Sequence, residues 1–360
     1  RSRGLGDVYK RQSEPKALFC FPGFTPKLSM DGMREVLAIG PARTMGNGIF
    51  DDVNEVLPGH YLIFSENTMS DHTYWNLFRA PHTDSYEQTV ETVSFLLRDS
   101  VTRQMVSDVP VCTFLSGGID SSIVTAIACR YMEKHGETLN TFSFDFKDND
   151  IYFKSNAFQP ERDLPYVKIM LDHYHTNHTY LECDENTLFS ALRDAVDAKD
   201  FPGMTDVDSS LLYFCSLVKK RNKVALTGEC ADEIFGGYPW YHNHEILFED
   251  CFPWLKSQDI RRSILKDGVL KNGEEYVRQR YLDTISLAPK LKSDTDLDRR
   301  MREMFYLNFY WFMQCLLERK DRCSMFSGLE VRVPFCDYRL VEYAYNMPCL
   351  LYTSDAADEE

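Results

Sequence analysis

A short polar segment in the middle of the chain has the residue types needed to bind phosphate. The segment TFLSGGIDSS covers residues 113–122 and follows an apolar run. Glycines let a ligand approach the backbone closely, and free N–H groups at the start of a helix attract anions. Serine hydroxyl groups add further hydrogen-bond donors. We therefore predict a phosphate-binding loop formed by Ser116, Gly117, Gly118, Ser121 and Ser122.

This loop differs from two common phosphate-binding motifs. It has no lysine, so it does not match G-x-x-x-x-G-K-[ST], and its glycines are adjacent, so it does not match G-x-G-x-x-G. A simpler interpretation is a strand-to-helix turn capped by a serine. Such a turn needs one glycine and one capping residue. The segment contains two glycines, three serines and an aspartate, which favours the phosphate-binding loop.

An aspartate inside the loop points to a divalent cation. Asp120 would repel phosphate oxygens unless a cation such as Mg²⁺ lay between them. A second acidic segment, LTGECADEIFGGY at 226–238, follows another predicted strand and contains Glu229 and Asp232. Because ligands bind at the carboxyl edge of a parallel sheet, we expect Asp120 and Asp232 to hold one Mg²⁺. The alternative is an acidic helix start stabilised by the helix dipole.

The elements around these segments alternate between strands and helices. Continuous apolar runs predict strands buried on both faces, and helical spacing of apolar residues predicts helices between them. The predicted strands are 109–115, 139–146, 177–183 and 223–228, and the predicted helices are 86–105, 121–136, 163–175, 185–199 and 207–221. This order indicates an α/β fold with a doubly wound parallel sheet. Residues 18–77 predict loops and a few strands, and 240–346 predict helices throughout.

The composition excludes some classes of partner. The chain has 360 residues, 44% of them hydrophobic, which is enough for one large core or two domains. Its formal net charge of −15 argues against nucleic acid, because binding a phosphate backbone requires clustered Lys and Arg. No run is long enough to span a membrane, and the 11 cysteines include no C-x-x-C pair. We therefore expect a cytoplasmic protein with reduced thiols and small-molecule substrates.

Three motifs in this order resemble one enzyme family. SGGIDSS (116–122) is the signature of PP-loop ATP pyrophosphatases, and two further motifs complete the pattern, at 226–238 and, as LERKDRCSMFSGLEVRVPFCD, at 317–337. Over residues 85–348 the chain resembles the synthetase domain of glutamine-hydrolysing asparagine synthetases. This resemblance implies an adenine nucleotide alpha hydrolase-like fold with a helical C-terminal part. Residues 13–80 resemble the tail of that family's glutamine amidotransferase domain, an Ntn-type α+β domain.

The resemblance implies an ATP-dependent ligase that makes asparagine. In that family the aspartate side chain attacks the α-phosphate of ATP to give β-aspartyl-AMP and pyrophosphate, and ammonia released from glutamine then displaces AMP. The matching residues imply that Glu229 deprotonates the ammonia and that Asp120 and Asp232 hold Mg²⁺. The positions implied to surround adenine and ribose are Leu115, Phe144, Thr227 and Gly228. In 317–337 we expect core residues and a helix cap at Asp337, with no catalytic group.

The chain also departs from the family pattern. No residue matches the N-terminal cysteine of the glutaminase or the catalytic lysine that follows 317–337, and Lys320 does not match that lysine. Residues 1–12 and 349–360 resemble translated sequencing adaptors, so we expect both to be non-native. We therefore expect a fragment with little activity of its own.

Two other functions stay open. A PP-loop amidotransferase on the same scaffold could act on another carboxylate, as β-lactam synthetases do. Alternatively, the domain could bind a nucleotide without catalysis. A nucleotide sensor needs no base beside the α-phosphate, so a requirement for Glu229 separates an enzyme from a sensor. The resemblance is compatible with a homodimer.

Overall fold

A five-stranded parallel sheet organises the middle of the chain. The computed structural model describes residues 13–65, 68–155, 161–255, 258–266 and 268–348. The strands of the sheet are β3 (Val111–Phe114), β4 (Asn140–Phe146), β5 (Asn177–Cys183), β6 (Val224–Leu226) and β7 (Glu330–Arg332). They pair in the order β5-β4-β3-β6-β7, and every neighbouring pair is parallel. The predicted doubly wound α/β fold is confirmed.

The strand order reverses at β3. β4 and β5 lie on one side of β3, whereas β6 and β7 lie on the other. The carboxyl ends of β3 and β6 therefore flank the topological switch point, where doubly wound folds bind ligands. The two segments predicted to carry chemistry, 116–122 and 227–232, follow these two strands.

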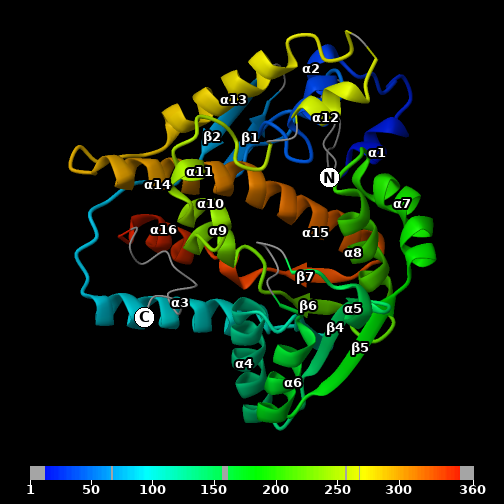
Figure 1. Ribbon diagram of the computed structural model, residues 1–360, viewed down its shortest axis with the longest axis vertical. Helices are drawn as coiled ribbons and strands as arrows, with labels where there is room; N and C mark the ends of the chain where they lie inside the picture. Colours follow the sequence, from blue (N-terminus) through cyan, green and yellow to red (C-terminus); the bar gives the residue numbers. More distant parts are fainter. Residues whose placement is uncertain (1–12, 66–67, 156–160, 256–257, 267, 349–360) are drawn as a thin grey trace.

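Helices cover both faces of the sheet (Figure 1). α4 (Ile119–Lys134) and α6 (Leu164–His173) lie on one face, and α7 (Glu185–Lys199), α8 (Thr205–Val218) and α15 (Gln314–Phe326) lie on the other. Because both faces are covered, every residue of β3 is buried. The Oγ1 atoms of Thr113 in β3 and Thr125 in α4 are hydrogen-bonded at 3.0 Å, which ties this helix to the sheet. The predicted helices of this region are confirmed to within three residues at each end.

The prediction that 240–346 is helical throughout is wrong for β7, which pairs with β6. Three residues with one apolar side chain, Val331, are too few for an alternating pattern to stand out. The strand is defined by backbone pairing instead, with Val331 opposite Ala225. The other elements after β6 are α9 (Ala231–Phe235), α10 (Pro239–His242), α11 (His244–Leu247), α12 (Gln258–Ser263), α13 (Gly273–Leu287), α14 (Asp296–Leu307), the π-helical turn η2 (Asn308–Met313), the 3-10 turn η3 (Pro334–Cys336) and α16 (Tyr338–Asn346).

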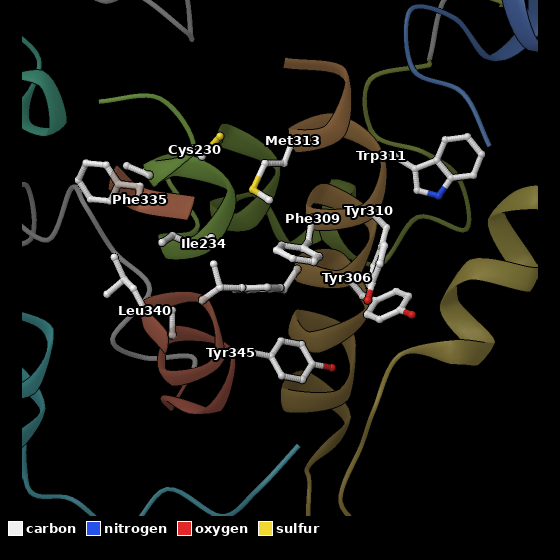
Figure 2. Packing of buried hydrophobic residues seen from close by; sticks show 14 of the residues in the cluster. Cys230, Ile234, Tyr306, Phe309, Tyr310, Trp311, Met313, Phe335, Leu340 and Tyr345 are labelled. Carbon is white, nitrogen blue, oxygen red and sulfur yellow. The ribbon is translucent and has the colours of Figure 1, made fainter. Parts of the chain in front are cut away.

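An aromatic core supports the helices that follow β6. Phe309, Tyr310 and Trp311 of η2 are buried. Figure 2 shows Phe309 beside Ile234 of α9 and Tyr345 of α16, whereas Trp311 lies on the other side of η2. Dense packing of this kind leaves side chains few alternative positions. The core therefore fixes α9, which carries Asp232 and follows the loop that carries Glu229.

The N-terminal part contains short elements, and the prediction of loops and a few strands over 18–77 is confirmed for two strands but missed the helical residues 30–39. The elements are α1 (Pro15–Phe19), α2 (Met30–Arg34), the π-helical turn η1 (Glu35–Ile39) and the antiparallel strands β1 (His60–Phe64) and β2 (Met69–Thr73). α3 (Tyr86–Gln104) then begins with a capping box formed by Ser85 and Gln88. A short helix, α5 (Asn149–Tyr152), follows β4. The domain boundary between residues 80 and 85 stays a prediction.

Two further predictions concern the ends of the chain and membrane-spanning helices. The segments predicted to be non-native, 1–12 and 349–360, lie outside the described residues. Among the described helices, none has the length and apolar character required to cross a membrane.

Candidate active site

The loop between β3 and α4 has a preformed shape that suits phosphate. Gly117 has a φ of +90°, and a Cβ at this position would lie 2.8 Å from the carbonyl oxygen of Asp163, so glycine is required. Ser121 closes the loop. Its Oγ accepts a hydrogen bond from the Ser116 N–H at 3.2 Å and donates one to the Gly118 carbonyl at 3.1 Å. Because α4 starts at Ile119, directly after Gly118, the positive end of its dipole faces this loop.

The loop after β6 lies directly against the loop after β3. The Cα of Gly228 is so close to α4 that an added Cβ would lie 2.5 Å from the backbone nitrogen of Ser121. Glycine at 228 therefore permits the two loops to meet. This contact brings Asp120, in the first turn of α4, into one cavity with Glu229 and with Asp232 of α9, as predicted from the sequence.

A cavity of about 400 Å³ opens between the two loops. Nine predicted site residues line it: Ser116, Gly118, Asp120, Ser121, Phe144, Thr227, Gly228, Glu229 and Asp232. Leu115, Gly117 and Ser122 were also predicted, but they are not among its lining residues. Leu115 is buried, and its N–H donates to the carbonyl of Phe142 in β4 at 2.9 Å.

Three phenylalanines form an apolar wall of the cavity. Phe114 and Phe144 come from neighbouring strands, and Phe214 comes from α8. The ring centroids of Phe114 and Phe214 are 4.7 Å apart, and those of Phe144 and Phe214 are 5.4 Å apart. Apolar and aromatic side chains of this kind line most small-molecule sites and suit a nucleobase. The sequence pointed to Phe144 but not to Phe214, whose position within a helix looks like an ordinary core position.

Asp120 and Asp232 interact electrostatically within the cavity. Burial and the nearby negative charge of Asp232 raise the pKa of Asp120 to about 7. Two carboxylates that repel each other in this way are stabilised by a divalent cation between them. Magnesium is commonly held by one or two carboxylates, with phosphate oxygens and water completing its shell. The donor set at this edge of the sheet therefore fits Mg²⁺ bound together with a nucleotide.

Glu229 is paired with two cations that were not predicted to belong to the site. Its Oε1 lies 3.0 Å from Arg319 Nη2 and 2.9 Å from Lys320 Nζ, and both basic residues line the cavity. They lie on α15 within 317–337, which we predicted to be structural. The prediction that Asp337 caps a helix is confirmed, because its side chain accepts from the Arg339 N–H. No sequence pattern marked the two missed residues, because they stand in the charged run 318–322 and only the fold buries them.

A doubly wound sheet with a PP-loop after its first strand defines an adenine nucleotide alpha hydrolase-like nucleotide-binding domain. The asparagine synthase family matches residues 92–358, and the chain belongs to this family. The chain is 48% identical over 346 residues to glutamine-hydrolysing asparagine synthetase 3 of Bacillus subtilis (strain 168). The aligned region covers 95% of the chain and 56% of that protein.

More distant relatives have different names. The chain is 26% identical over 299 residues to a putative glutamine-hydrolysing asparagine synthetase of Mycobacterium tuberculosis (strain ATCC 25618 / H37Rv), covering 74% of the chain and 43% of that protein. It is 27% identical over 357 residues to the amidase chyE of Penicillium rubens, covering 83% of the chain and 52% of that protein. The chain thus spans about half the length of the curated relatives it matches.

Proposed function

We propose that the whole protein is an ATP-dependent ligase that converts aspartate to asparagine through β-aspartyl-AMP, releasing AMP and pyrophosphate. The observation that carries this proposal is the meeting of two loops in one cavity. The loop after β3 and the first turn of α4 supply Ser116, Gly118 and Asp120, and the loop after β6 and the first turn of α9 supply Glu229 and Asp232. The first set suits the phosphates of ATP, and Glu229 provides a carboxylate beside them.

The residues of the cavity have separate roles in this reaction. The amides of the loop after β3 and the N-terminal end of α4 take up the negative charge that develops on pyrophosphate, because preorganised dipoles stabilise such charge without rearrangement. Asp120 and Asp232 would hold Mg²⁺, which neutralises phosphate oxygens and orients them for in-line attack. Phe144 and Thr227 border the proposed position of adenine and ribose.

Glu229 acts as the general base in the second half of the reaction. Ammonia attacks the carbonyl carbon of β-aspartyl-AMP and must then lose a proton. A carboxylate within hydrogen-bond reach can take this proton. Glu229 Oε2 is suited to this role, because it is buried and has no hydrogen-bond partner among the described residues, whereas Oε1 is held by two cations.

The ammonia is proposed to come from glutamine in the N-terminal domain of the whole protein. Residues 13–80 are proposed to be the tail of that domain. Their contacts with the synthetase part support this assignment, since Arg43 Nη1 lies 2.9 Å from Glu318 Oε2 on α15, and Lys16 Nζ lies 3.2 Å from Asp200 Oδ1. The proposed setting is the cytoplasm, in keeping with ten free thiols among the described residues, and a homodimer stays a prediction.

The proposal is tested by supplying ammonium salt in place of glutamine. Aspartate-dependent release of pyrophosphate, with AMP and asparagine formed in equal amounts, is expected. Glu229→Gln should reduce asparagine formation by about 10²-fold or more. Isotope exchange between pyrophosphate and ATP, which reports the first step alone, should persist in this variant.

Two results would contradict the proposal. Pyrophosphate release that depends on a different carboxylic acid and not on aspartate would indicate another amidotransferase of the same fold. Magnesium-dependent ATP binding without any acceptor-dependent pyrophosphate release would indicate a nucleotide-binding module without catalysis.

A further inference from the structure

The proposed reaction brings a negatively charged acceptor into a cavity that is already acidic. The lining residues include three carboxylates, from Asp120, Glu229 and Asp232. Among the lining residues that the structure describes, Arg319 and Lys320 are the only basic ones. An acceptor carboxylate approaching the α-phosphate therefore has two cations in the cavity wall available to offset the repulsion.

These two cations are held rigidly away from bulk water. Arg319 is 8% exposed and Lys320 is 6% exposed, and both project from α15. Lys320 Nζ also lies 5.4 Å from the ring centroid of Phe114, over the apolar wall. In such surroundings a cation attracts a carboxylate far more strongly than it does in water. Arg and Lys that serve only solubility are normally exposed, so their burial calls for an anionic partner.

The pairing with Glu229 leaves hydrogen-bonding capacity unused. Both cations contact the same oxygen, Oε1. Arg319 Nε is buried and has no hydrogen-bond partner among the described residues. A guanidinium group can bind a carboxylate through two parallel N–H groups, but Arg319 makes only one contact to Glu229 shorter than 3.5 Å, through Nη2. The pair can therefore accept a second carboxylate.

We infer that Arg319 and Lys320 form the subsite that binds the acceptor carboxylate, with Glu229 occupying it when the acceptor is absent. This inference rests on the proposed function. When an anionic acceptor arrives, it takes over contacts that Glu229 makes in the empty cavity. Glu229 is then less tightly held by the cations and available to accept the proton of ammonia. Acceptor binding and base release are thereby coupled through the same two side chains.

The test compares Michaelis constants for each substrate in variants of the whole protein. Ammonium salt supplies the nitrogen, pyrophosphate release is followed, and aspartate is the acceptor. Lys320→Gln and Arg319→Gln should each raise the KM for aspartate by about 10- to 100-fold, the loss expected for a charge-assisted hydrogen bond. The KM for ATP should change by less than about twofold. Lys320→Arg, which keeps the charge, should retain most of the aspartate affinity.

Lys220→Gln is the matched control, because Lys220 is an exposed lysine just after α8 and outside the cavity. Its kinetic constants should equal those of the wild type. Thermal unfolding of each variant checks that the fold is retained. If Lys320→Gln does not fold, Arg319→Gln carries the test, and an unchanged KM for aspartate together with a raised KM for ATP in that variant overturns the subsite.

The remaining outcomes separate the subsite from the proposed function. If the wild-type whole protein releases no pyrophosphate with aspartate, the proposed function fails. If the wild type is active but the glutamine variants show a normal aspartate KM, a reduced kcat and a raised KM for ammonia, the two cations only position Glu229. That result overturns the subsite and leaves the proposed function intact.

Discussion

Gly228 at the end of β6 packs against the backbone of Ser121 in α4. A Cβ at position 228 would lie 2.5 Å from the Ser121 nitrogen and 2.7 Å from the carbonyl carbon of Asp120. Two loops more than a hundred residues apart in sequence are therefore in direct backbone contact. The position of the phosphate-binding loop relative to the acidic loop depends on the absence of a side chain at this point.

Gly228→Ala should separate the two loops. The added methyl group meets backbone atoms that cannot move aside as a flexible side chain would, and overpacking of this kind costs about 1–3 kcal/mol. We expect ATP affinity, measured by calorimetric titration, to fall at least about tenfold. Gly136→Ala is the control. Gly136 has a positive φ of +71°, so alanine there strains the local backbone, but its Cβ would meet nothing within 4 Å. Equal loss of ATP affinity in both variants would refute the role of the loop contact.

Asp120→Asn should stabilise the ligand-free protein in a pH-dependent way. The folded state raises the pKa of Asp120 from an ordinary value near 3.8 to about 7, so the folded protein binds more protons than the unfolded chain between these pH values. The stability of the wild type therefore falls as pH rises through this window, by at most about 4 kcal/mol. The variant lacks this penalty. In chemical denaturation, the free energy of unfolding of Asp120→Asn should exceed that of the wild type by little at pH 4. The difference should grow up to pH 7 and then level off. An advantage that does not depend on pH would exclude this explanation.

Asp232→Asn should weaken the binding of ATP only when magnesium is present. The two carboxylates are proposed to share the cation, so the loss should be at least about tenfold with Mg²⁺. Without Mg²⁺, removal of a negative charge from the cavity should leave ATP binding equal or tighter. Glu133→Gln, at the exposed far end of α4, serves as a control of equal charge change. The same loss with and without Mg²⁺ would show that Asp232 does not act through the cation.

Lys199→Met should destabilise the helical layer that carries Phe214. Lys199 Nζ lies 3.3 Å from Asp208 Oδ2, and both side chains are almost fully buried, at 1% and 3% exposure. Removing the cation leaves a buried charge without compensation, which costs about 3–5 kcal/mol. Urea denaturation should show this loss, whereas Lys134→Met, at an exposed site, should change stability by less than about 0.5 kcal/mol. A loss of similar size in both variants would contradict the importance of the buried pair.

Local residue patterns were sufficient to predict four of the five strands of the parallel sheet, the helices between them and most of the cavity lining. β3 is a run of buried apolar residues, and the loop after it has glycines and serines whose conformations depend mainly on their immediate neighbours. The acidic residues Asp120, Glu229 and Asp232 could be placed at one edge of the sheet because parallel strands present their carboxyl ends together. Their chemical roles stay predictions.

Pairing between distant segments could be found only in the folded structure. β7 has only one apolar residue, Val331, and exists because β6 offers it hydrogen-bonding partners. Arg319 and Lys320 looked like part of a structural helix, since the sequence does not say which turn of α15 faces Glu229. Packing of α15 against α8 and β7 sets that orientation. The role of a buried charge depends on the partner that tertiary contacts bring to it. For Arg319 that partner is Glu229, which lies 90 residues away along the chain.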